Sequence, residues 1–186
     1  MTGFREFLQG ELFEIMEQRK DQLRPVEDIH QEELAYLVGM LTRFIDTSHF
    51  LQHYTNSPLY DLTLRQNSGA PKTALTGLGD FCLFRTGFFP MGFKTKRTAP
   101  RKNFILAGQK AYWLVAESQN QPLEMFRSLA LNFLIFSNLI SEIRLRYMSE
   151  QELMDLYDFW LETDSDFAQE ALRKKGVAPQ RFSHSI

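Results

Sequence analysis

The chain has 186 residues, 44% of them hydrophobic, with 21 basic and 23 acidic side chains and a formal net charge of −2. This length is enough for one well-packed domain. The near balance of charge excludes a generally basic nucleic-acid coat protein and an acidic disordered tail. The balance hides a segregation, because residues 62–116 contain nine basic residues and one acid, Asp80, whereas the segments on either side are net acidic.

Two amphipathic helices are predicted in the first third of the chain. From Thr2 to Leu23, apolar residues recur at helical spacing and polar residues occupy the remaining positions. A second helix is predicted to begin at Pro25, a residue that suits the first turn of a helix. It should continue to about Tyr54, before the polar and proline-containing residues 56–58 end it.

The middle of the chain predicts two further helices and a basic loop. The first helix spans residues 73–89 and contains Gly77 and Gly79, which weaken helix propensity but allow a neighbouring backbone to approach closely. A glycine- and proline-containing loop follows at about residues 90–101. The next helix is predicted over residues 102–117.

The last third of the chain predicts the most apolar helix and two shorter ones. The apolar helix covers residues 122–147. Ser149 and Glu152 match a capping box, which marks the start of the next helix. Gly176 ends a final short helix, and a flexible tail is predicted at about residues 177–186.

These elements predict the fold class. Strand-type alternation is not sustained in any segment, and the predicted helices are joined by short links. The sequence therefore predicts an all-α fold, with residues 1–186 forming a single-domain bundle of six to eight helices. The longest apolar stretch, residues 129–140, is shorter than the roughly 20 residues that span a bilayer, so no membrane span is predicted.

The first residues of the chain and its cysteine content indicate the cellular compartment of the protein. One cysteine cannot form an intrachain disulfide, and the first residues do not present a charged region followed by an apolar run. We therefore expect a cytoplasmic protein. The single Cys82 lies among phenylalanines, and such surroundings raise the pKa of a thiol, so a buried and inert cysteine is predicted.

The most metal-like set of side chains consists of Asp46, His49 and His53. Offsets of three and seven residues put all three on one narrow stripe of a helix, where two imidazoles and a carboxylate can share a divalent metal. The alternative is a histidine pair near a helix C-terminus, where positive charge is favourable. The absence of a cofactor is the favoured prediction, and a divalent metal is the alternative.

Asp80 is the most distinctive acidic residue, because it is the single acid of the basic segment and is flanked by apolar residues and glycine. A half-buried carboxylate needs an arginine, lysine or helix-terminal partner. We predict that Asp80 is an ion-pair anchor in preference to a catalytic acid or base. Arg85 is the second buried polar candidate.

The basic loop is the strongest candidate for a binding surface. Its cations, bordered by phenylalanines, could attract phosphate or nucleic acid through charge and stacking. The anion-binding candidates are Lys94, Lys96, Arg97, Arg101 and Lys102. The competing hypothesis is that the acidic run of residues 150–170 neutralises them, within one chain or between two.

One segment resembles a known group of proteins. The run from Leu78 to Pro90, LGDFCLFRTGFFP, followed by Ala107-Gly108 and Ala111-Tyr112, resembles a group of uncharacterised bacterial helical proteins and covers about a fifth of the chain. The resemblance implies a bacterial source. It implies no particular activity and supplies no catalytic residues.

The sequence as a whole favours a soluble, non-catalytic helical protein that binds a partner or ligand and self-associates as a homodimer. Complementary charged segments could meet across a two-fold axis. One alternative is a metal- or cofactor-dependent enzyme that uses Asp46, His49 and His53. The other is an accessory protein that binds an anionic ligand or nucleic acid through the basic residues of 94–102.

Overall fold

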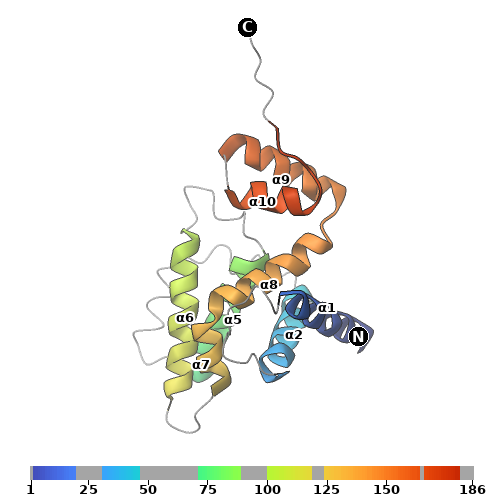
Figure 1. Ribbon diagram of the computed structural model, residues 1–186. Coiled ribbons are helices and arrows are strands. Elements are labelled where there is room, and N and C mark those ends of the chain that lie inside the picture. Colours follow the sequence, from blue (N-terminus) through green and yellow to red (C-terminus); the bar gives the residue numbers. More distant parts are fainter. Residues whose placement is uncertain are drawn as a thin grey trace. The chain divides into compact units, whose positions relative to one another are not determined.

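The computed structural model describes residues 2–19, 31–46, 71–88, 100–118, 124–163 and 166–180. Over these ranges the chain forms eight α-helices and no strand, which confirms the all-α prediction. The helices are α1 (Thr2–Arg19), α2 (Gln31–Asp46), α5 (Lys72–Phe88), α6 (Arg101–Glu117), α7 (Glu124–Leu131), α8 (Phe133–Arg146), α9 (Glu150–Thr163) and α10 (Asp166–Lys174) (Figure 1). The chain divides into two compact units, Met1–Glu142 and Ile143–Ile186.

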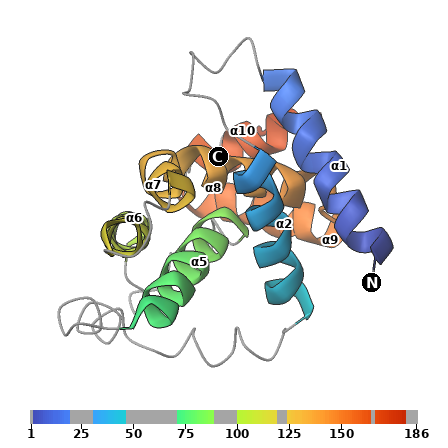
Figure 2. The same ribbon diagram turned by 90° about the horizontal axis from the view of Figure 1, so that it is seen from below.

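Helix α5 is the central helix of the first unit. It packs against α6 and α2, while α6 packs against α7 and α2 packs against α1 and α7. Figure 2 shows α5 between α6 and α2. Every residue from Leu78 to Phe84 is buried, and a helix that is covered around its whole circumference needs no polar face. This explains why the segment is almost continuously apolar.

The core of the first unit is aromatic. The fully buried large side chains include Phe81, Phe84, Tyr112, Phe133 and Phe136. Aromatic rings bury a large area per residue, so each contributes much to the packing between the helices. These described phenylalanines are therefore packing residues.

Two glycines that look alike in sequence have different environments on α5. A Cβ atom built on Gly79 would lie 2.5 Å from Cε1 of Tyr112, whereas one built on Gly77 would have no atom of the described residues within 4 Å. The predicted close approach is therefore present at Gly79, where the neighbour is an aromatic side chain, and the prediction is wrong for Gly77. Gly108 on α6 makes a similar contact, because its Cβ would lie 2.5 Å from the ring of Phe133.

The predicted apolar helix over residues 122–147 is broken in the structure, and that prediction is wrong at Asn132. Helices α7 and α8 meet there at a bend of 75°. Asparagine is a poor helix former, and Phe133, which follows it, packs against Gly108. Among the described helices, none alone is long and apolar enough to cross a membrane, and α7 and α8 meet that criterion only as a bent pair.

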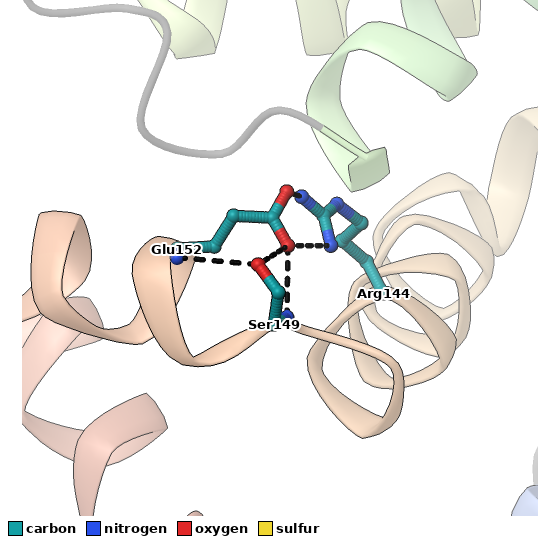
Figure 3. Close-up of polar contacts among 3 residues, drawn as sticks. All are labelled: Arg144, Ser149 and Glu152. Carbon is teal, nitrogen blue, oxygen red and sulfur yellow. Dashed lines mark hydrogen bonds and ion pairs between the residues drawn. The ribbon is translucent and has the colours of Figure 1, made fainter.

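The second unit contains the last turn of α8 together with α9 and α10. The predicted capping box is confirmed at the start of α9 (Figure 3). The backbone N–H and the hydroxyl of Ser149 each donate to Oε2 of Glu152 at 2.9 Å, and the N–H of Glu152 donates back to the Ser149 hydroxyl at 3.4 Å. Arg144 pairs with the same carboxylate, so one acidic side chain joins the end of α8 to the start of α9.

We expect this cap to stabilise the protein at neutral pH and to be lost in acid. Hydrogen bonds from Arg144, and then from the backbone of Ser149, lower the pKa of Glu152 from its usual 4.5 to about 2. A carboxylate with a lowered pKa stabilises the folded state fully above pH 4.5, and that contribution disappears as the pH falls through about 2.

Glu152→Gln should therefore lower the free energy of unfolding at neutral pH. The loss should be only about 0.5 kcal/mol, because solvent screens this exposed ion pair and glutamine still accepts a hydrogen bond from Ser149. Urea titrations at several pH values check this expectation. The difference between the two proteins should shrink steadily below pH 4.5. A difference of constant size down to the acid limit would contradict it.

The end of α10 is also formed as predicted. Gly176 has φ = 75°, a left-handed conformation that favours glycine. Its N–H donates to the carbonyl of Arg173, and the N–H of Val177 donates to the carbonyl of Leu172. This pair of hydrogen bonds is a Schellman motif, so Gly176 ends the helix as predicted. Beyond it, the carbonyl of Gln180 accepts a hydrogen bond from the Tyr157 hydroxyl at 2.9 Å, within the part of the predicted tail that the structure describes.

Candidate functional site

The buried carboxylate of Asp80 is the centre of a polar network that joins three helices. Its Oδ1 accepts hydrogen bonds from the hydroxyls of Tyr36 on α2, at 2.5 Å, and Tyr112 on α6, at 2.9 Å. Its Oδ2 accepts one from the guanidinium of Arg43 on α2, at 3.0 Å. Asp80 is only 4% exposed, so these groups replace the water that would otherwise solvate it.

Local sequence explains how the partners reach Asp80. Tyr36 and Arg43 are seven residues apart on α2 and therefore lie on the same side of that helix. Tyr112 is fully buried, and its ring lies against Gly79, the residue before Asp80. A larger residue at position 79 would separate the ring from α5 and lengthen the Tyr112–Asp80 hydrogen bond.

The electrostatics of the network fix the protonation of the phenols. Burial raises the pKa of the Asp80 carboxyl, and the hydrogen bonds from Tyr36 and Tyr112 and the charge of Arg43 oppose that rise. Burial, and then the nearby Asp80 charge, raises the pKa of both tyrosines. Both phenols therefore stay protonated and act as donors, not as bases or nucleophiles.

The sequence predicted an arginine, lysine or helix-terminal partner for Asp80 but not the two tyrosines. Arg43 is that partner, and it lies on a helix 37 residues earlier in the chain. Arg85 is half-buried, and its burial lowers the pKa of its guanidinium. Tyr112 carried one signal, its place in the Ala-Tyr pair of the resemblance segment, but nothing in the local pattern of α2 marks Tyr36.

Cys82 is fully buried, as predicted, and burial raises the pKa of its thiol. Its Cβ atom lies 2.8 Å from the position that a Cβ on Gly108 would occupy. The residue therefore fills the contact between α5 and α6. A thiol in this environment is a packing group.

Arg101 was predicted at the end of the basic loop, and the structure places it one residue inside helix α6. It is the first residue of α6, and its guanidinium donates to the carbonyl of Thr86 at 3.3 Å and to the hydroxyl of Ser137 at 3.2 Å. The hydroxyl of Ser141 donates to the next carbonyl of α5, that of Gly87, at 2.7 Å.

These two donors satisfy carbonyls in the last turn of α5, which have no partner within their own helix. A cation is favourable at that negative end of the helix dipole. Partial burial lowers the pKa of the Arg101 guanidinium. Helix α6 therefore begins one residue before its predicted start, and the guanidinium of its first residue contacts the end of α5.

The other anion-binding candidates have different outcomes. Lys102 is exposed on α6. Lys94, Lys96 and Arg97 lie outside the described residues. The structure therefore brings together no pair of these five candidates at a common site within the ranges that it describes.

The metal hypothesis also falls largely outside those ranges. Asp46 is the last residue of α2, but the description does not extend to its side chain or to His49 and His53. Among the histidine, cysteine, aspartate and glutamate side chains that are described, no group of three is close enough to hold a metal ion.

Exposed leucines occur on α6, α7 and α8. Helices α6 and α7 run side by side (Figure 1). Their register is set by Arg127, whose guanidinium lies 5.4 Å from the centre of the Trp113 ring, and by Gln109, which donates to the carbonyl of Ala130. One turn before Gln109 on α6, Leu106 therefore lies near the junction of α7 and α8.

Leu131 and Leu134 flank that junction, on either side of Asn132. Leu106 is 53% exposed, Leu131 is 59% exposed and Leu134 is 47% exposed. Leu131 is the last residue of α7 and Leu134 lies in the first turn of α8, beyond the bend at Asn132. Leu106 lies on the opposite side of α6 from the buried Val115. We refer to Leu106, Leu131 and Leu134 as the leucine surface.

The helical fold and the buried Asp80 network define an all-α protein whose described polar centre holds its helices together. No family model, curated protein or solved structure matches the chain. The function is therefore inferred from the side chains alone.

Proposed function

We propose that this chain is a non-catalytic helical interaction protein that associates with further copies of itself. The observation that carries the proposal is the leucine surface. Single exposed leucines are common on proteins, but three on helices that pack against one another are what an interaction site would use. Fully burying an exposed leucine contributes about 1.5–3 kcal/mol. Each of these side chains is about half exposed, so the three together can contribute roughly 2–4 kcal/mol to association.

The chemistry of the buried groups supports the same proposal. Asp80 and its two tyrosines are occupied with one another, and Cys82 is enclosed by packing. Arg101 caps the end of α5. These side chains therefore act in the architecture of the first unit, which leaves its outer surface as the part that can meet a partner.

The leucine surface predicts the effect of introducing charge. Leu131→Glu combined with Leu134→Glu should reduce self-association by about 100-fold or more, because a carboxylate is costly to bury in an apolar contact. Sedimentation velocity over a wide range of protein concentration measures this effect. Wild type should show a mass above the 21.8 kDa of one chain at high concentration.

A matched control separates this effect from the added charge. Gln9→Glu combined with Gln31→Glu adds the same charge at two exposed positions on α1 and α2, and it should associate like wild type. A wild-type chain that stays monomeric at the highest concentration would overturn the proposed function. So would a double leucine variant that associates as strongly as wild type while its circular dichroism is unchanged.

A further inference from the structure

We propose that the leucine surface of one copy binds helix α9 of a second copy. This inference rests on the proposed function and names the partner surface. Three features of α9 support it: an exposed face, a uniform charge, and the spacing of two apolar side chains. The two surfaces belong to different units of the chain, and the contact proposed is between two copies.

Helix α9 has two distinct sides. Leu156 and Trp160 are buried on one side. On the other side, Met154 and Leu161 are exposed, and they are seven residues apart, so they lie above one another after two turns. Large apolar side chains on the outer side of a helix are what a helix-in-groove contact uses as anchors.

The charge of α9 is uniform. The helix contains five acidic residues and no lysine or arginine. Asp155 and Asp158 are exposed beside Met154. We refer to Met154, Asp155, Asp158 and Leu161 as the α9 face.

The leucine surface has the opposite charge around it. Lys102 and Lys110 are exposed one turn before and one turn after Leu106 on α6. Arg127, also exposed, lies one turn before Leu131 on α7. An acidic helix therefore meets cations on both sides of the apolar contact, and such complementarity sets the choice and orientation of a partner.

The spacing of the apolar side chains also matches. Met154 and Leu161 are separated by about 10 Å along α9, given a rise of about 1.5 Å per residue. Packed helices such as α6 and α7 have axes about 8–10 Å apart. If α9 of one copy crosses α6 and α7 of another, one of its two exposed apolar side chains can contact Leu106. The other can then contact Leu131 and Leu134.

A charge-exchange experiment on the full chain tests the inference. The acidic-face variant carries Asp155→Lys and Asp158→Lys, and the basic-rim variant carries Lys102→Glu and Lys110→Glu. Each variant alone should associate about 10-fold or more weakly than wild type, because each then brings like charges together. An equimolar mixture of the two should recover association, since the reversed face of one meets the reversed rim of the other.

Sedimentation velocity gives the readout, and circular dichroism checks that each variant is folded. A control with Glu6→Lys and Glu170→Lys reverses two exposed acids elsewhere and should associate like wild type. If wild type associates but the acidic-face variant associates equally well, the inference is overturned and the proposed function stands. If wild type is monomeric, the proposed function fails.

Two further outcomes would also overturn the inference. The first is that both variants are monomeric and their mixture is monomeric too, so that no pairing between the two surfaces exists. The second is that the rim meets an anionic lipid surface instead. In that case the basic-rim variant would lose binding to phosphatidylserine vesicles, while the acidic-face variant would bind the vesicles like wild type and still self-associate.

Discussion

Replacing Asp80 by alanine is expected to lower the free energy of unfolding by about 3 kcal/mol. The substitution leaves the hydroxyls of Tyr36 and Tyr112 without their acceptor, and Tyr112 is fully buried where water cannot replace it. An orphaned buried hydroxyl costs about 1–3 kcal/mol. Arg43 adds little to the loss, because its side chain is 65% exposed and can return to water.

A graded series of variants tests this account of the network. Tyr112→Phe should lower the free energy of unfolding by about 1–2 kcal/mol, because Asp80 keeps the hydrogen bonds from Tyr36 and Arg43. Arg43→Ala should cost about 0.5 kcal/mol, as expected for a largely exposed ion pair. Glu6→Ala, which removes an exposed carboxylate from α1, is the control and should stay within about 0.5 kcal/mol of wild type.

Urea denaturation followed by tryptophan fluorescence measures these changes. The chain has two tryptophans, and a Trp160→Phe background leaves Trp113, which lies in the same unit as the network. The expected order of losses is Asp80→Ala, then Tyr112→Phe, then Arg43→Ala. If the arginine variant lost as much stability as the aspartate variant, the ion pair would dominate the network and the tyrosine hydroxyls would be minor partners.

Gly79→Ala is expected to cost about 2–3 kcal/mol, a large effect for one added methyl group. The new Cβ atom would lie 2.5 Å from Cε1 and 2.6 Å from Cδ1 of the Tyr112 ring. The ring cannot move away freely, because it is fully buried and its hydroxyl is bound to Asp80. Relief of the overlap therefore requires α5 and α6 to move apart or the hydrogen bond to break.

Gly77→Ala provides the matched control two residues earlier on the same helix. Nothing lies within 4 Å of a Cβ at that position, so the added methyl group meets no neighbour. The variant should be more stable than wild type by about 0.5–1 kcal/mol, because alanine favours a helix more than glycine does. The two alanine substitutions should therefore have opposite signs in the same urea titration.

A double-mutant cycle locates the cause of the Gly79 effect. In a Tyr112→Leu background the ring is absent, and Gly79→Ala should cost about 1 kcal/mol less than in wild type. An equal cost in both backgrounds would show that the methyl group is rejected for a reason other than the Tyr112 ring.

Local patterns predicted several elements because local interactions form them. The capping box of Ser149 and Glu152 and the glycine stop at Gly176 involve groups within a few residues of one another. The limits of α5 and α6 were predicted to within one residue, since proline-containing segments adjoin both. The bend at Asn132 was missed, because it depends on the fit of Phe133 against a distant helix.

By itself the sequence determined that this protein is helical, where α5, α6 and α9 lie, and that a buried carboxylate at Asp80 would need an arginine, lysine or helix-terminal partner. Only the tertiary structure decided which partners it has, because Tyr36 and Tyr112 lie 44 and 32 residues away in the chain. It also decided that the guanidinium of Arg101 donates to the carbonyl of Thr86 at the end of α5. Helix spacing depends on neighbours within one or two turns, whereas these contacts form only when separate helices pack.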